Sequence, residues 1–412
     1  MGTGTNQELA SPPAYPTDTD NPATEQKQTS LKEAEAEAAK LLVEAAAIDA
    51  SLDVPKSRKG KQKRFVAEDA TIEGKRQVPL PMMLLFLALV VIALMVLSLC
   101  IGRYQVDLST TIKILLSPIF GGETGIDWTQ NQYNVIMNLR FPRALAAMLV
   151  GAALALSGAS YQGVFQNPLV SPDILGVSYG ACVGAALSIL LYLNTWWTQI
   201  LAFAGGLLTV FITVSIPKLM HRHTNVVMVL SGVIVGGFMS SILGIMKYVA
   251  DPDTQLAEIT YWQLGSIAKV NFDLLSYTAP VMIVAAIVLI AMRWRLNLIS
   301  LGEEEARSLG VDIRKERLII IVAATILTAS AVSVAGTIGW VGLIIPHVTR
   351  RIVGADNKRL IPTVVFVAAA FMLLVDLLAR NISGFEIPLG ILTGLIGAPI
   401  FGYILVKQRE VE

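Results

Sequence analysis

Apolar runs of about twenty residues dominate the chain after residue 80, and each has the length that an α-helix needs to cross a bilayer. Ten such runs alternate with shorter polar stretches. They cover residues 82–101, 143–163, 173–193, 199–219, 226–248, 277–293, 317–335, 338–352, 361–379 and 387–406. The eighth run is short and contains Pro346, so its ends are the least sharply defined. The pattern predicts an all-α integral membrane protein with ten spans.

The first 80 residues form a polar arm, which holds 24 of the 63 charged side chains. Residues 1–28 are rich in Thr, Pro, Asn and Asp, a composition that predicts disorder. The Ala/Glu-rich stretch that follows predicts a helix near residues 31–50. The basic run KSRKGKQKR at 56–64 precedes the first span, which favours a cytoplasmic arm that can also touch anionic lipid headgroups.

Lysine and arginine are unevenly divided between the two sets of loops. With the N-terminus inside the cell, ten spans return the C-terminus to the same side. In that orientation 25 of the 32 Lys and Arg residues fall on the cytoplasmic side and 7 fall outside. Because positively charged loops tend to stay in the cytoplasm, the asymmetry predicts that both termini are cytoplasmic.

The overall composition agrees with a membrane protein and excludes several other classes. Hydrophobic residues make up 54% of the chain and charged residues 15%, and the net charge is +1, so no nucleic-acid partner is expected. Cys100 and Cys182 lie in apolar runs, which favours buried free thiols over a disulfide. The histidines at 221, 223 and 347 are too few and too scattered for a metal site, and no catalytic residue is expected.

Ionisable side chains are scarce inside the predicted spans. Asp376 lies in the ninth span, and Arg380 follows one turn later, where the two can neutralise each other. Ion-coupled carriers need acidic or basic groups near the bilayer midplane, so the sequence favours a bundle that is driven by another subunit. The chain contains no GxxxxGK[ST] phosphate-binding loop, so ATP would be hydrolysed by a separate protein. An ion-coupled secondary carrier that depends on Asp376 is the alternative.

The predicted cytoplasmic loop at 293–317 contains one compact charged segment. The sequence SLGEEEARSLGV at 300–311 predicts a short amphipathic helix with glycines near both ends. Leu301, Ala306 and Leu309 would form its apolar side, with Glu303, Glu304 and Arg307 on the side facing water. Such a helix offers a surface on which another subunit can press; a plain connecting loop is the alternative.

Glycines recur at four-residue spacing in several spans. The sets are Gly176, Gly180 and Gly184; Gly232 and Gly236; and Gly390 and Gly394. In lipid such stripes let helix backbones approach closely. Packing within the bundle is one interpretation, and lining of a subunit interface or pathway is the other.

Four segments together carry a resemblance to a known family. They are LRFPRALAAMLVGAALALSGASYQGVFQNPLVSPDILGVSYGA at 139–181, LGEEEARSLGV at 301–311, GTIGWVGLIIPHVTRRIVG at 336–354 and DLLARNISGFEIPLGILTGLIGAPIFGYIL at 376–405. In this respect the chain resembles the permease subunits of binding-protein-dependent ABC importers for iron-siderophores, haem and vitamin B12. The resemblance covers about residues 80–406, so the membrane domain is taken as 81–407, and it leaves the arm at 1–80 unexplained.

The resemblance implies the fold, the location and the partners. The expected fold is the ten-span type II importer bundle in a prokaryotic cytoplasmic membrane. Two copies of the permease would form a pathway along their interface, two ATPase subunits would bind Mg-ATP beneath them, and an external binding protein would deliver the substrate. This chain itself would hold no cofactor, and an iron-siderophore is the first expectation for the substrate, followed by a corrinoid or haem.

The resemblance also implies roles for individual residues. Residues 297–315 would form the coupling helices that dock into the ATPase. The expected coupling contacts are Leu301, Gly302, Glu303, Glu304, Glu305, Ala306, Arg307, Leu309 and Gly310. Arg140, Arg143 and Arg380 would bind acidic residues of the binding protein. The fifth and tenth spans would line the pathway through Gly232, Gly236, Gly390 and Gly394.

Overall fold

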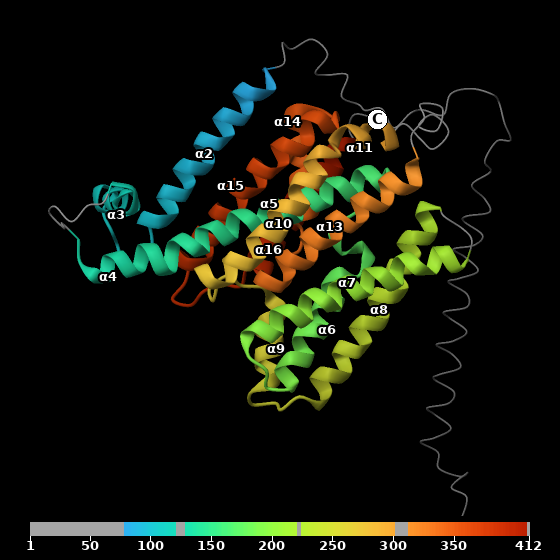
Figure 1. The fold of residues 1–412 in the computed structure, drawn as a ribbon, viewed down its shortest axis with the longest axis horizontal. Helices are drawn as coiled ribbons and strands as arrows, with labels where there is room; N and C mark the ends of the chain where they lie inside the picture. The colour runs from blue at the N-terminus through green and yellow to red at the C-terminus, as the bar shows by residue number, and fades with distance from the viewer. Residues whose placement is uncertain (1–77, 121–127, 221–223, 301–311, 410–412) are drawn as a thin grey trace, which may run out of the picture. The chain divides into compact units, whose positions relative to one another are not determined.

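The structure, a computed structural model, describes residues 78–120, 128–220, 224–300 and 312–409 (Figure 1). Every regular element in these ranges is a helix. The polar arm with its expected helix near 31–50 and the charged segment at 301–311 lie outside the described residues. The predictions made for those two stretches therefore stay predictions.

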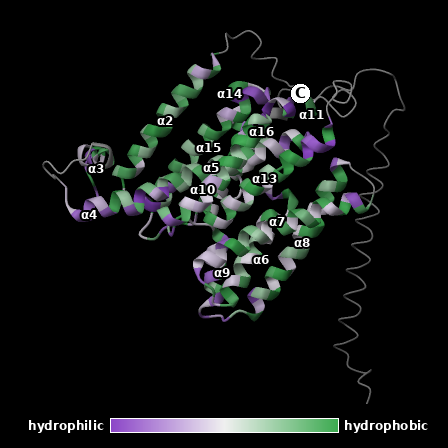
Figure 2. Ribbon diagram, in the orientation of Figure 1, coloured by the Kyte–Doolittle hydropathy of each residue, from purple (hydrophilic) through white to green (hydrophobic). Residues whose placement is uncertain are grey.

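All ten predicted spans coincide with helices. These are α2 (Leu80–Cys100), α5 (Phe141–Phe165), α6 (Val177–Leu190), α7 (Thr195–Leu219), α8 (Asn225–Val249), α10 (Phe272–Ala291), α13 (Ile313–Ala335), α14 (Val341–Val353), α15 (Asn357–Asn381) and α16 (Leu389–Arg409). Among the described residues seven helices are long and apolar enough to cross a membrane; α6, α14 and the apolar part of α16 are shorter. Figure 2 shows the apolar character of α2 along almost its whole length. The prediction of an all-α membrane bundle is confirmed.

Shorter helices connect the long ones. They are α3 (Leu108–Phe120), α4 (Gln130–Tyr133), the π-helix η1 (Asn134–Arg140), the 3-10 helix η2 (Pro172–Leu175), α9 (Gln255–Leu264) and α11 (Arg293–Ser300). α4 and η1 continue directly into α5. The predicted third span at 173–193 is wrong in one respect: it is not a single helix, because Gly176, with a φ of +80°, separates η2 from α6.

Polar side chains fix the residues at which several spans begin. The capping residues are Asn194 for α7, Thr224 for α8, Asn271 for α10, Asp312 for α13 and Asp356 for α15. Each accepts a hydrogen bond from a backbone amide of the first turn. These amides have no partner within the helix, and lipid offers none, so the caps fit helices that begin at the membrane border.

α5 and α13 form the interior of the bundle, whereas α2 lies at its edge. In the most apolar stretch of each helix, 78% of the residues of α5 and of α13 are buried, against 17% for α2. α5 packs on α10, α13, α14 and α15, as Figure 1 shows. Small residues allow this: a Cβ atom on Gly158 would lie 1.8 Å from the carbonyl oxygen of Gly342 in α14. The close approach of α5 and α14 therefore requires glycine at position 158.

A second close contact joins α6 to α7. A Cβ atom on Gly184 would lie 1.9 Å from the carbonyl oxygen of Leu201, and one on Gly180 would lie 2.4 Å from that of Gly205. Two of the glycines predicted to allow close helix packing therefore do so within the chain.

Candidate functional site

A buried cluster of charged side chains joins α5 to α15 and to the loop that follows α15. Arg143 Nε donates a hydrogen bond to Asp376 Oδ1 at 2.8 Å, and Arg143 Nη1 donates to Glu386 Oε1 at 2.7 Å. Arg380 Nε lies 3.1 Å from Asp376 Oδ2, which is the ion pair expected from their spacing. Asp376 is fully buried. Its carboxylate is therefore held between two guanidinium groups, as a charge in this environment requires. We call this end of the bundle the arginine end.

Arg380 and a third arginine, Arg140, tie the C-terminal end of α2 to the arginine end. Arg380 Nη2 donates to Ser98 Oγ at 2.7 Å. Arg140 Nη1 donates to the carbonyl oxygens of Leu99 and Cys100 at 2.6 and 3.1 Å. The last carbonyls of a helix have no intrahelical partner, and a guanidinium, with five N–H groups, can satisfy several of them. Arg140 thus acts as a side-chain cap for α2.

The three arginines expected to bind a binding protein are buried in this structure. Arg140, Arg143 and Arg380 are 7%, 8% and 9% exposed, and each is bonded within the chain. A role in docking stays a prediction, and it would require these groups to exchange an internal partner for an external one. The side chain of Glu386 is 42% exposed, so it is the member of the cluster that reaches the surface.

Glu386 is the member of the charged cluster that the sequence analysis missed. It lies in the loop between α15 and α16 and is the only acidic residue from 377 to 409. An acidic residue without acidic neighbours is visible in the sequence. Its pairing with Arg143, 243 positions earlier, is not, because it depends on the packing of α5 against α15. A second contact on this loop is made by Arg103, whose guanidinium donates to the carbonyl oxygen of Gly384.

At the opposite end of the same helices, α11 is anchored on α5 and α15. Gln166 Nε2, at the C-terminal end of α5, donates to the carbonyl oxygen of Ile299 at 2.7 Å. Asn297 Nδ2 donates to Asp356 Oδ1 at 2.6 Å, and Asn297 Oδ1 accepts from the amide of Asn357 at 2.9 Å. We call these three bonds the α11 clamp. It holds the residues that directly precede segment 301–311.

The other side of that segment is anchored as well. Asp312 caps α13 and accepts a hydrogen bond from the Lys315 amide at 3.4 Å, a bond that holds the pKa of Asp312 below its ordinary value. Arg295 of α11 pairs with Glu316 of α13 at 3.2 Å. The predicted coupling residues themselves, Leu301 to Gly310, lie outside the described residues. The chain on both sides of them is fixed to the bundle.

The four glycines predicted to line a pathway lie against other helices of the same chain. A Cβ atom on Gly232 would be 2.0 Å from the Ile174 carbonyl oxygen, and one on Gly390 would be 2.6 Å from that of Leu264. A Cβ atom on Gly236 or on Gly394 would make only ordinary contacts, 3.7 Å from Gly176 and from Trp340 respectively. Close packing within the bundle accounts for the glycines at 232 and 390, and a pathway role for all four stays a prediction.

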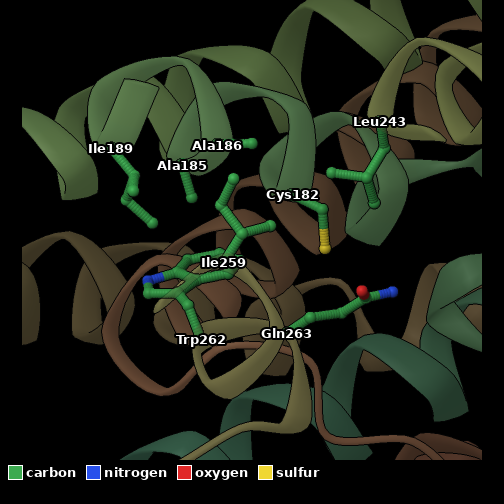
Figure 3. Close-up of a pocket in the computed structure, with 8 residues that line it drawn as sticks. All are labelled: Cys182, Ala185, Ala186, Ile189, Leu243, Ile259, Trp262 and Gln263. Atoms are coloured by element: carbon green, nitrogen blue, oxygen red, sulfur yellow. The ribbon is translucent and has the colours of Figure 1, made fainter. Parts of the chain in front are cut away.

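A small apolar pocket lies between α6, α8 and α9 (Figure 3). It is lined by Cys182, Ala185, Ala186, Ile189, Leu243, Ile259, Trp262 and Gln263. The space between these side chains is too narrow for a water molecule, so it is no substrate site. In the described part of the chain, no three His, Cys, Asp or Glu side chains lie close enough together to hold a metal ion.

Known proteins resemble this chain over nearly all of the membrane domain. The model of the FecCD transport family matches residues 89–407. The molybdate import system permease protein MolB of Haemophilus influenzae is 38% identical over 332 residues, which are 80% of this chain and 97% of that protein. A Helicobacter pylori permease named for iron chelatin transport is 34% identical over 326 residues, which are 75% of this chain and 99% of that protein.

A solved structure shows the same architecture. It is an ABC transporter described as of metal-chelate type, in an inward-facing conformation, and it is 37% identical to this chain with a TM-score of 0.70. The match covers 79% of this chain and 99% of that one. Fold, family model and relatives agree along the ten helices, so the chain belongs to the FecCD transport family of ABC importer permeases.

Proposed function

We propose that this chain is the permease subunit of an ATP-driven importer that takes a metal chelate from an external binding protein into the cytoplasm. An iron-siderophore is the first candidate for the chelate. Two copies of the chain would enclose the pathway, two ATPase subunits would bind on the cytoplasmic side, and both termini would lie there. Family membership over residues 89–407 is the observation that carries this proposal.

The structure supports a route by which an ATPase could move the bundle. The α11 clamp connects the residues before segment 301–311 to α5 and α15. These two helices pack on each other and carry the buried charge cluster at their other ends. A displacement of the segment would therefore reach the arginine end through two packed helices, as in rigid-body switching.

Charge reversal in the coupling segment tests the proposal. Replacing Glu303, Glu304 and Glu305 by lysine should abolish ATP-dependent uptake, because the acidic face that docks on the ATPase would become basic. Uptake is measured in proteoliposomes that contain the permease, its ATPase and its binding protein. Lys218→Glu, a charge change on an exposed side chain at the predicted cytoplasmic end of α7 and outside residues 297–315, is the control. Unchanged uptake in the triple variant would contradict the coupling role.

An ion-coupled carrier is the competing function, and Asp376 is its test. In the structure this carboxylate is fully buried between Arg143 and Arg380. A group so neutralised is poorly suited to binding and releasing a proton or sodium ion. Uptake that is driven by an imposed ion gradient in vesicles without ATPase, and that is lost in Asp376→Asn, would support the carrier instead.

Molybdate is a second candidate substrate, because the Haemophilus influenzae relative with 38% identity is named for its import. An iron chelate and a molybdate oxyanion differ in size and charge, so one assay can separate them. Proteoliposomes with the cognate binding protein are offered radiolabelled ferric siderophore, cobalamin, haem or molybdate. Saturable uptake of the iron chelate would support the first candidate. Uptake of molybdate alone would make molybdate the substrate instead.

A further inference from the structure

α3 carries an apolar stripe that the described chain leaves uncovered. Leu108, Ile112 and Leu116 are 55%, 42% and 42% exposed. Because they are spaced four residues apart, they fall on one side of the helix. On the opposite side, Thr111 and Ile114 are fully buried. α3 therefore has two apolar faces, one packed on the protein and one open.

The packed face holds α3 against the last turn of α2. The Cys100 thiol donates a hydrogen bond to Thr111 Oγ1 at 3.5 Å. Ile114 belongs to a small apolar cluster with Val106 and with Ile136 of η1. Figure 1 shows α3 beside the end of α2. The height of α3 relative to the membrane is therefore set by the point at which α2 ends.

By its length and composition α2 can cross the hydrocarbon layer and end at its border. Its 21 residues extend about 31 Å, which matches the ~30 Å thickness of that layer. The exposed side of α2 stays apolar to its end, where Leu97 and Ile101 are 42% and 40% exposed. Directly beyond it, Arg140 donates to the carbonyl oxygens of Cys100 and Tyr104, as polar backbone at the edge of lipid requires.

We propose that α3 is an interfacial helix that lies along the membrane surface at the arginine end, with Leu108, Ile112 and Leu116 inserted into lipid. The partner is lipid because α3 packs beside the end of α2, whose exposed side stays apolar up to the level where α2 leaves the hydrocarbon layer. The stripe is entirely aliphatic, and Lys113, which is also exposed, lies on a side of the helix turned away from it. Helices of this kind settle between the headgroups and the acyl chains.

Site-specific fluorescence in lipid nanodiscs tests this proposal. The full chain, with Cys100→Ser and Cys182→Ala, receives one cysteine at Ile112, Leu116 or Lys113, labelled with a dye whose emission shifts to the blue in apolar surroundings. Lipids brominated near the headgroup should quench the labels at 112 and 116 at least about twofold more strongly than the label at 113. Lipids brominated near the chain ends should quench them less, because an interfacial helix lies shallow. Each variant must elute as a single species before it is measured.

Other occupants of the stripe give different results. Labels at 112 and 116 that stay in water and unquenched would overturn the proposal. Labels that become protected only when the binding protein is added, or only when two copies of the chain are crosslinked through α3, would also overturn it, in favour of a protein interface. None of these readings depends on the ATPase or the substrate, so failure here leaves the proposed transport function untouched.

Discussion

Asp376 is the buried counter-charge to two arginines of the arginine end. It lies within 2.8 Å of Arg143 and 3.1 Å of Arg380, and no part of it is exposed. Replacing Asp376 by asparagine keeps the shape but removes the charge, which leaves two buried guanidinium groups with only Glu386 nearby. Breaking a buried pair in this way costs about 3–5 kcal/mol. We expect Asp376→Asn to lower clearly the midpoint of thermal unfolding in detergent.

Glu386→Gln is the matched control for Asp376→Asn. The Glu386 side chain is 42% exposed, so water screens its bond to Arg143, and such exposed pairs contribute roughly 0–1 kcal/mol. The midpoint should therefore move much less than for Asp376→Asn. Equal shifts of the midpoint in the two variants would show that the contribution of Asp376 to stability does not depend on the burial of its carboxylate.

At the scale of the elements, glycine decides how closely α5 approaches α14. In Gly158→Ala the new Cβ would meet the Gly342 backbone at 1.8 Å, so the two helices must separate. Overpacking of this kind costs about 1–3 kcal/mol. Gly244→Ala in α8 is the control, because no atom lies within 4 Å of its Cβ position and alanine favours a helix. Thermal unfolding should show loss of stability for the first variant alone; two equal midpoints would contradict the close packing.

The sequence determined the spans better than the contacts between them. Hydropathy located all ten helices, because each needs an apolar run of its own. It did not show the break at Gly176, since the stretch around it is apolar on both sides. The pair of Asp376 and Arg380 was predictable because it is local. The bonds from Arg143 to Glu386 and from Gln166 to Ile299 were not, because they depend on how α5 packs among distant segments.

In the molecule as a whole, α5 and α15 connect two polar sites that the apolar interior separates. One is the arginine end, where α2 and the loop after α15 are held by ion pairs and backbone hydrogen bonds. The other is the α11 clamp beside segment 301–311. Few charged residues lie in the spans between the two sites, so the sites are connected mainly by the packing of small residues. The α11 clamp is therefore the place where this mechanical connection can be broken selectively.

Loss of the clamp should separate ATP hydrolysis from transport. In the double variant Gln166→Ala and Asn297→Ala, all three bonds that hold α11 to α5 and α15 are removed, while segment 301–311 is unchanged. The ATPase would still bind, but its movement would be absorbed by a loosened α11, as happens when a positioning contact is lost. In proteoliposomes we expect uptake to fall about tenfold, the equivalent of 1.4 kcal/mol of coupling, with hydrolysis largely retained. Arg295→Gln, which removes only the 40% exposed side chain paired with Glu316, should leave both rates near normal. If uptake and hydrolysis fall together in the double variant, α11 serves ATPase binding and not the transfer of motion.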